Sequence, residues 1–498
     1  MNEYAAALDF GSSKIALAVG EKCENGIRII SYNDVRTDGI DKGEIVKDKQ
    51  TVDAIRELVR KAEEQTGKHI GKVSVSLSGK ALFSKTEFNS RIRSNPDEYI
   101  STDELAGMAE SLYKSRMDEG MTVFEVIPQS YNVDEYQGLD HKDLIGRKGS
   151  TVEARYNLVY GKSSILERRK AILSECGLSI DKAILAPVAA ARAVFKGPEK
   201  ENGAVLVDMG KGTTEIAVVK DDVVRMVSSI PFAGESITRD IKTVANVTAK
   251  WAEEAKVLHG CSCADFTPEN KKLILRNADG VKEGEIELAL LSEITEARLS
   301  EIFEAIRYLI DNSGYGDALP SGIVLTGGTA YMEFIQQLGQ AITGRSIRLA
   351  SPSGSITSDS DEKAFDAYSS VAVGLVIETL SPEMSYAISN ATATAPVRPV
   401  SPRPVGGIFD NNEGEPQWAE DEEMRKDERA RKEEEKRRRK EEEKRRKEEE
   451  RKRKEEEKKR KEQERNSNNN DNKNGKDGKE GGFFGSLFGD IFSGNNEA

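Results

Sequence analysis

The sequence contains few of the residues on which disulfide-rich, metal-binding and membrane-spanning proteins depend. Its 498 residues include four cysteines, three histidines and two tryptophans, and no run of 18 apolar residues. Four scattered cysteines form no disulfide framework, and a lone Cys261-x-Cys263 is poor zinc spacing. We therefore expect a reduced, cytosolic environment and no transmembrane helix. The first residues, MNEYAAALDFG, lack the basic and apolar regions of a signal peptide.

The net charge of −13 is divided unevenly along the chain. Residues 420–465 carry 23 basic and 20 acidic side chains, which leaves 51 basic and 67 acidic side chains in the other 452 residues, a net of −16. An acidic body argues against nucleic acid as a partner. The nearly balanced block argues against a simple polybasic tail.

Composition divides the chain into a long folded part and a tail. Up to about residue 380, strand-like and helix-like patterns alternate, which predicts an α/β fold with sheets covered by helices. Six of the 14 prolines lie in 381–419, as expected of an extended linker. The charged block 420–465, a polar spacer 466–482 and an apolar segment 483–493 follow.

Within the folded part, one pattern occurs twice. YAAALDFGSSKIALAVG places Asp9, and GAVLVDMGKGTTEIAVVK places Asp208, at the end of an apolar strand before a small-residue turn. Each copy predicts a β-hairpin, and two copies predict two similar halves that face each other. The turns offer backbone N–H groups and hydroxyls to phosphate oxygens, and the two carboxylates suit a water-coordinated Mg²⁺. The candidate residues here are Asp9, Gly11, Ser12, Ser13, Lys14, Asp208, Gly210, Lys211, Gly212, Thr213 and Thr214.

Two further segments add candidate contacts. In GIVLTGGTAYM, Gly327, Gly328 and Thr329 follow an apolar strand, where glycines let the backbone lie flat against a nucleotide base. Glu253 and Lys256 share one helix face at i,i+3 spacing. They could bind ribose hydroxyls, or they could pair with each other in solvent.

These four segments, in this order, resemble the actin/Hsp70/sugar-kinase superfamily. The resemblance implies two lobes, each with a five-stranded sheet, which bind ATP and Mg²⁺ between them, and it adds Gly234 to the site. ILAPVAAARAVF and SSVAVGLVIE resemble the two interlobe helices, whose small residues allow close packing. A sugar-kinase-like or chaperone-like ATPase is the alternative. No catalytic aspartate for a sugar kinase stands out, and no peptide-binding domain follows residue 380.

Within the superfamily, the chain resembles the FtsA family of bacterial cell division proteins. The resemblance rests on VSVSLSGK, VFEVIPQSYNVDEYQGLDHKDLIGRKGS, SSIPFAGESITRDI and EEAKVLHGCS. It implies an actin-like two-lobe ATPase fold with an FtsA-type inserted subdomain. The implied boundaries are 1–80 with 161–200 for the first lobe, 81–160 for the insertion, 201–232 with 306–380 for the second lobe, and 233–305 for its smaller subdomain.

The same resemblance implies a function and partners. FtsA-like proteins polymerise, anchor FtsZ filaments to the cytoplasmic membrane at the septum, and recruit later division proteins. Residues 233–305 would bind the acidic, apolar C-terminal peptide of FtsZ, and the inserted subdomain would contact neighbouring copies and division proteins. Arg298 is the candidate FtsZ contact, with pairing to Glu301 as the alternative.

Two departures from the superfamily pattern bear on hydrolysis. Lys211 stands where a glycine is usual, and it could donate to a phosphate or point outward from the turn. Ala186 precedes Pro187, and no Glu or Gln lies between Ile184 and Phe195 to orient an attacking water. We therefore expect ATP binding with slow or negligible hydrolysis, because general-base assistance of about 10²–10⁴-fold is missing.

The tail carries two patterns. From 441, EEEKRRK, EEERKRK and EEEKKRK repeat every seven residues, so six of seven i,i+4 pairs are opposite in charge. Such pairs favour a single solvated helix, with a disordered polyampholyte as the alternative.

In 483–493, stepping 100° per residue places all six large apolar residues on one face, which predicts an interfacial membrane helix or, alternatively, a partner-binding peptide. These six are Phe483, Phe484, Leu487, Phe488, Ile491 and Phe492.

Overall fold

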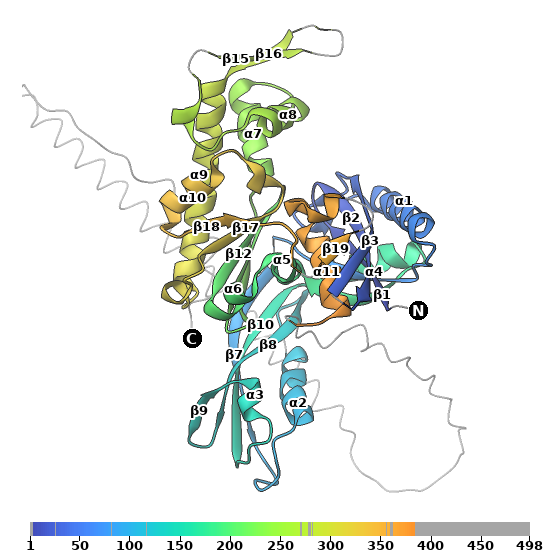
Figure 1. Ribbon diagram of the computed structural model, residues 1–498, viewed down its shortest axis with the longest axis vertical. Coiled ribbons are helices and arrows are strands. Elements are labelled where there is room, and N and C mark those ends of the chain that lie inside the picture. Colours follow the sequence, from blue (N-terminus) through green and yellow to red (C-terminus); the bar gives the residue numbers. More distant parts are fainter. Residues whose placement is uncertain are drawn as a thin grey trace, which may run out of the picture. The chain divides into compact units, whose positions relative to one another are not determined.

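The computed structural model describes residues 3–383, except 25, 81, 116, 269–270, 277–279, 281, 355 and 359–361 (Figure 1). The predicted charged helix, polar spacer and membrane segment lie outside the described residues, as does all but the start of the linker. No helix in the described part of the chain is long and apolar enough to cross a membrane.

Lobe 1 is built on a mixed sheet with the strand order β11-β6-β1-β2-β3-β19. Its strands are β1 (Tyr4–Phe10), β2 (Lys14–Cys23), β3 (Gly26–Arg36), β6 (Lys72–Leu77), β11 (Ser179–Leu185) and β19 (Ile356–Ser358). A small hairpin of β4 (Ile40–Asp41) and β5 (Glu44–Ile45) and the helices α1 (Asp48–Thr66) and α4 (Ser163–Glu175) complete the lobe. The resemblance implied five strands, and the sixth is the three-residue β19, which pairs in parallel with β3.

Lobe 2 has a five-stranded sheet with the order β14-β13-β12-β17-β18, as the resemblance implied. Its strands are β12 (Ala204–Met209), β13 (Thr214–Lys220), β14 (Val223–Ile230), β17 (Ile323–Thr326) and β18 (Ile347–Leu349). Around it lie α6 (Gly197–Asn202), α7 (Gly234–Ala245), α8 (Ala249–His259), α9 (Leu288–Asn312), α10 (Ile335–Thr343) and the hairpin of β15 (Lys272–Arg276) and β16 (Lys282–Glu287).

The sequence repeat forms two equivalent hairpins, β1–β2 and β12–β13. Side chains alternate across a strand, so Asp9 shares a face with Ala5 and Ala7, and Asp208 shares a face with Ala204 and Leu206. These apolar residues belong to one core cluster that spans both lobes. The alternation therefore places both aspartates on the sheet faces that meet between the lobes.

Two short helices, α5 (Ala186–Val194) and α11 (Ser370–Leu380), fill that shared core, as the sequence predicted for the interlobe helices (Figure 1). Their backbones approach so closely that a Cβ placed on Gly374 would collide with the carbonyl group of Ala189. Only glycine fits there, because the obstacle is backbone rather than the end of a flexible side chain.

Replacing Gly374 with alanine should therefore destabilise the protein by about 3 kcal/mol, the upper range for overpacking a core. Gly107, inside α2 (Thr102–Tyr113), is the matched control because a Cβ there meets only the end of the Arg91 side chain at 3.8 Å. Gly107→Ala should be neutral or slightly stabilising. Urea unfolding of both variants measures the difference, and equal midpoints would contradict the close packing.

An inserted subdomain, hereafter the insert, lies between β6 and α4. Its sheet has the order β7-β10-β8-β9, formed by β7 (Leu82–Ile92), β10 (Thr151–Lys162), β8 (Met121–Val133) and β9 (Tyr136–Leu139). Helices α2 (Thr102–Tyr113) and α3 (His141–Leu144) accompany it. Leu105 and Met108 of α2 pack with Tyr156 and Leu158 of β10 in a separate apolar core.

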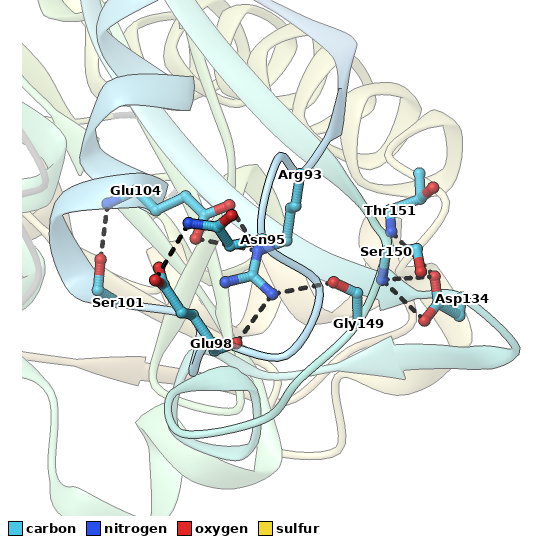
Figure 2. A network of polar contacts seen from close by, with 9 residues as sticks. All are labelled: Arg93, Asn95, Glu98, Ser101, Glu104, Asp134, Gly149, Ser150 and Thr151. Atoms are coloured by element: carbon cyan, nitrogen blue, oxygen red, sulfur yellow. Dashed lines mark hydrogen bonds and ion pairs between the residues drawn. The ribbon is translucent and has the colours of Figure 1, made fainter.

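The loops at the far end of the insert are held by two polar centres (Figure 2). The buried Arg93 side chain donates to the carboxylate of Glu104 at 2.9 Å and to the carbonyl oxygens of Glu98 and Gly149 at 3.1 and 2.9 Å. Asp134, with a φ of +48°, accepts hydrogen bonds from the backbone N–H groups of Ser150 and Thr151 at the start of β10. The bond from Arg93 to Gly149 joins loops that are 56 residues apart in the chain.

Candidate functional site

The turns of the two hairpins come together where the lobes meet. A Cβ on Gly212, in the second turn, would lie 2.6 Å from the Ser12 hydroxyl oxygen in the first turn. Ser12 and Thr213 are partly exposed and Ser13 is exposed, while Thr214 is buried and donates to the carbonyl oxygen of Phe232 at 3.0 Å. The structure thus brings the predicted hydroxyl-rich turns into contact. The Thr214 hydroxyl, however, is used in a hydrogen bond within lobe 2.

Asp9 and Asp208 end strands β1 and β12 in the same region. Burial raises the pKa of Asp9, opposed by a hydrogen bond with Ser76 and by the charges of Lys14 and Arg169. Burial, and then the charge of Asp9, raises the pKa of Asp208 to about 7. Because the charge of Asp9 raises the proton affinity of Asp208, a divalent cation bound between them would relieve the repulsion.

Lys14 lies at the lobe 1 side of this region. Its ammonium is 2.8 Å from the Tyr32 hydroxyl, 3.5 Å from an Asp34 carboxylate oxygen and 3.9 Å from the centre of the Tyr368 ring. Burial lowers its pKa, and the charges of Asp34 and Asp9 oppose that change. In this structure Lys14 is thus held by side chains of β3 and of the segment before α11.

The loop after β17 packs on the second hairpin turn. The Thr329 hydroxyl donates to the Gly210 carbonyl oxygen at 2.7 Å, and the backbone N–H of Gly234 donates to the same oxygen at 3.2 Å. Gly327 has a φ of +91°, and a Cβ there would collide with the Asp208 carboxylate. Gly328 is exposed, and a Cβ there would meet nothing within 4 Å. The predicted base-binding loop therefore lies directly beside Asp208.

Glu253 and Lys256 pair with each other, and Lys256 is buried against α7 while the Glu253 side chain is 39% exposed. The Lys256 ammonium donates to Glu253 at 2.7 Å, to the Thr238 hydroxyl at 2.9 Å and to the Gly234 carbonyl oxygen at 3.0 Å. Burial lowers the pKa of Lys256, with Glu253 opposing the change. The pair is thus tied to the start of α7, next to Thr329.

Lys211 points outward from its turn and forms an ion pair with Glu235 at 3.4 Å. Both side chains are about one-third exposed. This geometry corresponds to the outward alternative, and the backbone adopts it without a positive φ.

Two buried charged residues at this site were missed in the sequence. Glu215, directly opposite Asp208 across β12–β13, is 4% exposed, and burial followed by the charges of Asp208 and Asp9 raises its pKa well above the usual value. Arg169 of α4 is fully buried, which lowers its pKa to about 10, while Asp9 and Glu215 oppose that change. Comparing the two repeats would have revealed Glu215, because Ala16 occupies the equivalent position opposite Asp9.

The expectation of slow hydrolysis rests on the absence of Glu and Gln from α5. Glu215 lies outside α5, on β13 beside Asp208, and is a third carboxylate near the proposed nucleotide site.

A metal ion at this site would need ligands beyond the protein. In the described part of the chain, no group of three or more His, Cys, Asp or Glu side chains could hold a metal ion. Asp9 and Asp208 nevertheless fit Mg²⁺, which retains several waters and commonly uses one or two carboxylates plus phosphates.

The raised pKa of Asp208 makes the stability of the ligand-free protein pH-dependent. Because the folded-state pKa of about 7 exceeds the ordinary aspartate value of 3.8, the stability that protonated Asp208 contributes is complete below about pH 4 and is lost as pH rises through 7. Asp208→Asn should remove this loss. The variant should therefore gain stability over the wild type between pH 5 and pH 7.5 in urea unfolding. A difference that is the same at both pH values would contradict the raised pKa.

Arg298, the candidate peptide contact, lies on α9 and is partly buried. It forms an ion pair with Asp240 of α7 at 2.6 Å and a second one with Glu301. Hydrogen bonding to Asp240 raises its pKa. The pairing alternative is thus present in this structure, and a peptide contact remains a prediction.

The fold and site define the class: a two-lobed, actin-like α/β protein with an acidic site where the lobes meet. Among solved structures, the PilM–PilN type IV pilus biogenesis complex is similar in fold, with a TM-score of 0.56 and 14% identity over 76% of this chain and 99% of that chain. This likeness concerns the fold alone.

The sequence comparisons are more specific. The family model "Cell division protein FtsA" matches residues 205–374. FtsA of Enterococcus hirae is 30% identical over 349 residues, covering 69% of this chain and 77% of that protein. FtsA of Pseudomonas aeruginosa is 28% identical over 402 residues, covering 80% and 95%. The chain belongs to the FtsA family of cell division proteins, as the sequence motifs indicated.

Proposed function

We propose that this protein is an ATP-binding, actin-like adaptor that polymerises, anchors FtsZ filaments to the cytoplasmic membrane at the septum, and recruits later division proteins. Family membership supports the role in cell division. The observation that carries the nucleotide part is the meeting of Asp9, Asp208 and two small-residue turns between the lobes.

In this proposal the turns bind the phosphates of ATP, and Asp9 and Asp208 hold Mg²⁺ through its waters. Mg²⁺ would supply positive charge that neutralises both the carboxylates and the phosphates. Gly327 and Gly328 face the base, and Glu253 and Lys256 lie near the ribose. Hydrolysis is slow because α5 contributes no group that orients water.

The FtsZ peptide would bind the subdomain formed by α7, α8, α9 and the β15–β16 hairpin. The peptide is acidic, and Arg298 already pairs with an acidic residue, Asp240. An incoming carboxylate would compete with Asp240 for the guanidinium.

Arg298→Glu should therefore weaken binding of the FtsZ C-terminal peptide about tenfold or more, since it replaces attraction by repulsion. Asp240→Asn is the opposite change, because it removes one of the two ion pairs of Arg298 without altering Arg298, and binding should become tighter. Fluorescence anisotropy with a labelled peptide measures both. If neither variant changes the affinity, Arg298 is only a structural ion pair.

Attachment to the membrane would depend on the tail, outside the described residues. Residues 483–493 are the proposed anchor, and the charged block 420–465 sets their distance from the body. If the block is helical throughout, it spans about 70 Å at 1.5 Å per residue. The insert, residues 81–160 in the sequence, is the proposed contact for neighbouring copies and division proteins.

Co-sedimentation with liposomes and FtsZ tests the whole proposal. The full chain should carry FtsZ to the vesicles, and a chain lacking 483–498 should leave both in the supernatant. ATP should increase the recovery of the full chain by promoting its polymerisation. FtsZ that reaches the vesicles equally well without this protein's last 16 residues would refute the anchoring role.

A further inference from the structure

The insert belongs to lobe 1 by chain connection, yet its sheet is hydrogen-bonded to lobe 2. The Ser84 hydroxyl of β7 donates to the carbonyl oxygen of Val227 at 2.6 Å and accepts from its N–H at 3.1 Å. The Asn157 side chain of β10 donates to the carbonyl oxygen of Arg225 at 3.1 Å. Both partners lie on β14, an edge strand of lobe 2, so the insert covers part of that edge.

A second contact joins the insert to lobe 2 at its root, the point where the chain enters it. The backbone N–H of Gly79, just before the insert, donates to the Glu215 carboxylate at 3.2 Å. Gly79 packs so tightly on Gly43 that a Cβ on Gly43 would collide with its backbone. Arg169 of α4, the helix that follows the insert, donates to the Gly43 carbonyl oxygen at 3.3 Å. The entry of the chain into the insert therefore lies beside Glu215, and α4 contacts the adjoining Gly43.

Glu215 also faces the acidic site. It is the cross-strand neighbour of Asp208, and directly opposed residues in an antiparallel pair project from the same face with Cβ atoms about 4.5–5.5 Å apart. A cation that binds beside Asp208 therefore changes the electrostatic potential at the Glu215 carboxylate, which accepts the hydrogen bond from Gly79.

We infer that Glu215 is a positioning residue that couples the nucleotide site to the contact between the insert and β14. This inference rests on the proposed binding of Mg²⁺ and nucleotide between Asp9 and Asp208. Coupling between two sites is reciprocal. The nucleotide must then change how firmly the insert is held, and loosening the insert must change nucleotide affinity.

Amide hydrogen exchange of the full chain tests the first direction, with Mg·AMP-PNP as the probe. In the wild type, saturating probe should change exchange in 79–92 and 223–230 about fivefold or more, the lower end of typical couplings. Glu215→Ala should abolish this response. Glu215→Gln keeps an acceptor oxygen for Gly79 without the charge, so it should retain wild-type exchange in the absence of probe and still lose the response.

Nucleotide affinity tests the other direction. Asn157→Ala removes a bond from the insert to lobe 2 and should change the Kd for Mg·AMP-PNP about fivefold or more. Asn89→Ala is the matched control, because Asn89 donates only to Met108 and Ser111 within the insert in the contacts described, and its Kd should be unchanged. In a Glu215→Ala background, Asn157→Ala should have no further effect.

The outcomes separate this inference from the proposed function. A wild-type chain that does not bind Mg·AMP-PNP would overturn both. Binding with unchanged exchange in both segments, together with a wild-type Kd for Asn157→Ala, would overturn the coupling and leave nucleotide binding intact.

Discussion

Asp208→Asn should weaken binding of Mg·ATP about 10–100-fold, the usual cost of removing a group that orients the shell of a bound metal ion. The asparagine keeps the shape of the side chain but removes one of the two negative charges that would attract Mg²⁺. Calorimetric titration with ATP in the presence of Mg²⁺ measures the effect. Chelating Mg²⁺ should weaken the wild type by a similar factor and the variant by much less.

Asp222→Asn is the matched control for this experiment. Asp222 lies in the same lobe, at the exposed turn between β13 and β14, and its backbone N–H donates to Lys200. The same chemical change there should leave the Kd for Mg·ATP unaltered. Equal affinities for Asp208→Asn and Asp222→Asn would show that the acidic site is not where nucleotide binds.

Phe488→Glu should release the full chain from phospholipid vesicles. Burial of a phenylalanine side chain contributes about 1.5–3 kcal/mol, so its loss alone weakens partition about 10–100-fold, and the charge in the apolar face adds to this. Vesicle sedimentation at several lipid concentrations measures the partition coefficient.

Ser486→Glu is the control, because it adds the same charge to the opposite, polar face of the predicted helix. On zwitterionic vesicles, where surface charge plays no part, it should bind nearly as well as the wild type. If both variants lose binding equally, the segment does not lie on the membrane as an amphipathic helix. If both bind fully, another segment is the anchor.

The two hairpins and the interlobe helices could be predicted from the sequence because each depends on local patterns. The order of apolar strand, Asp-x-Gly and hydroxyl turn recurs around Asp9 and Asp208, and both copies fold alike. The small residues around Ala189 and Gly374 predicted close helix packing, and the backbones do meet there.

Other features could not be predicted from local patterns. Strand β19 has three residues, too few to show a periodicity. Arg169 shares a helix face with Ile165 and Ile172, unlike its exposed neighbour Arg168, but that spacing does not predict full burial of an arginine. Its burial follows from the packing of α4 on lobe 1, where it also lies over the Phe10 ring.

The sequence by itself determined which residues could bind a nucleotide, that they come in two matching sets, and that an acidic body precedes a charged block and an apolar end. Spacing and composition are properties of the chain and need no partner in space. Only the tertiary structure decided that Glu215 accepts from Gly79, that Lys256 is buried against Gly234, and that the insert bonds to β14. These depend on contacts between residues 22 to 143 positions apart in the chain, which no local pattern specifies.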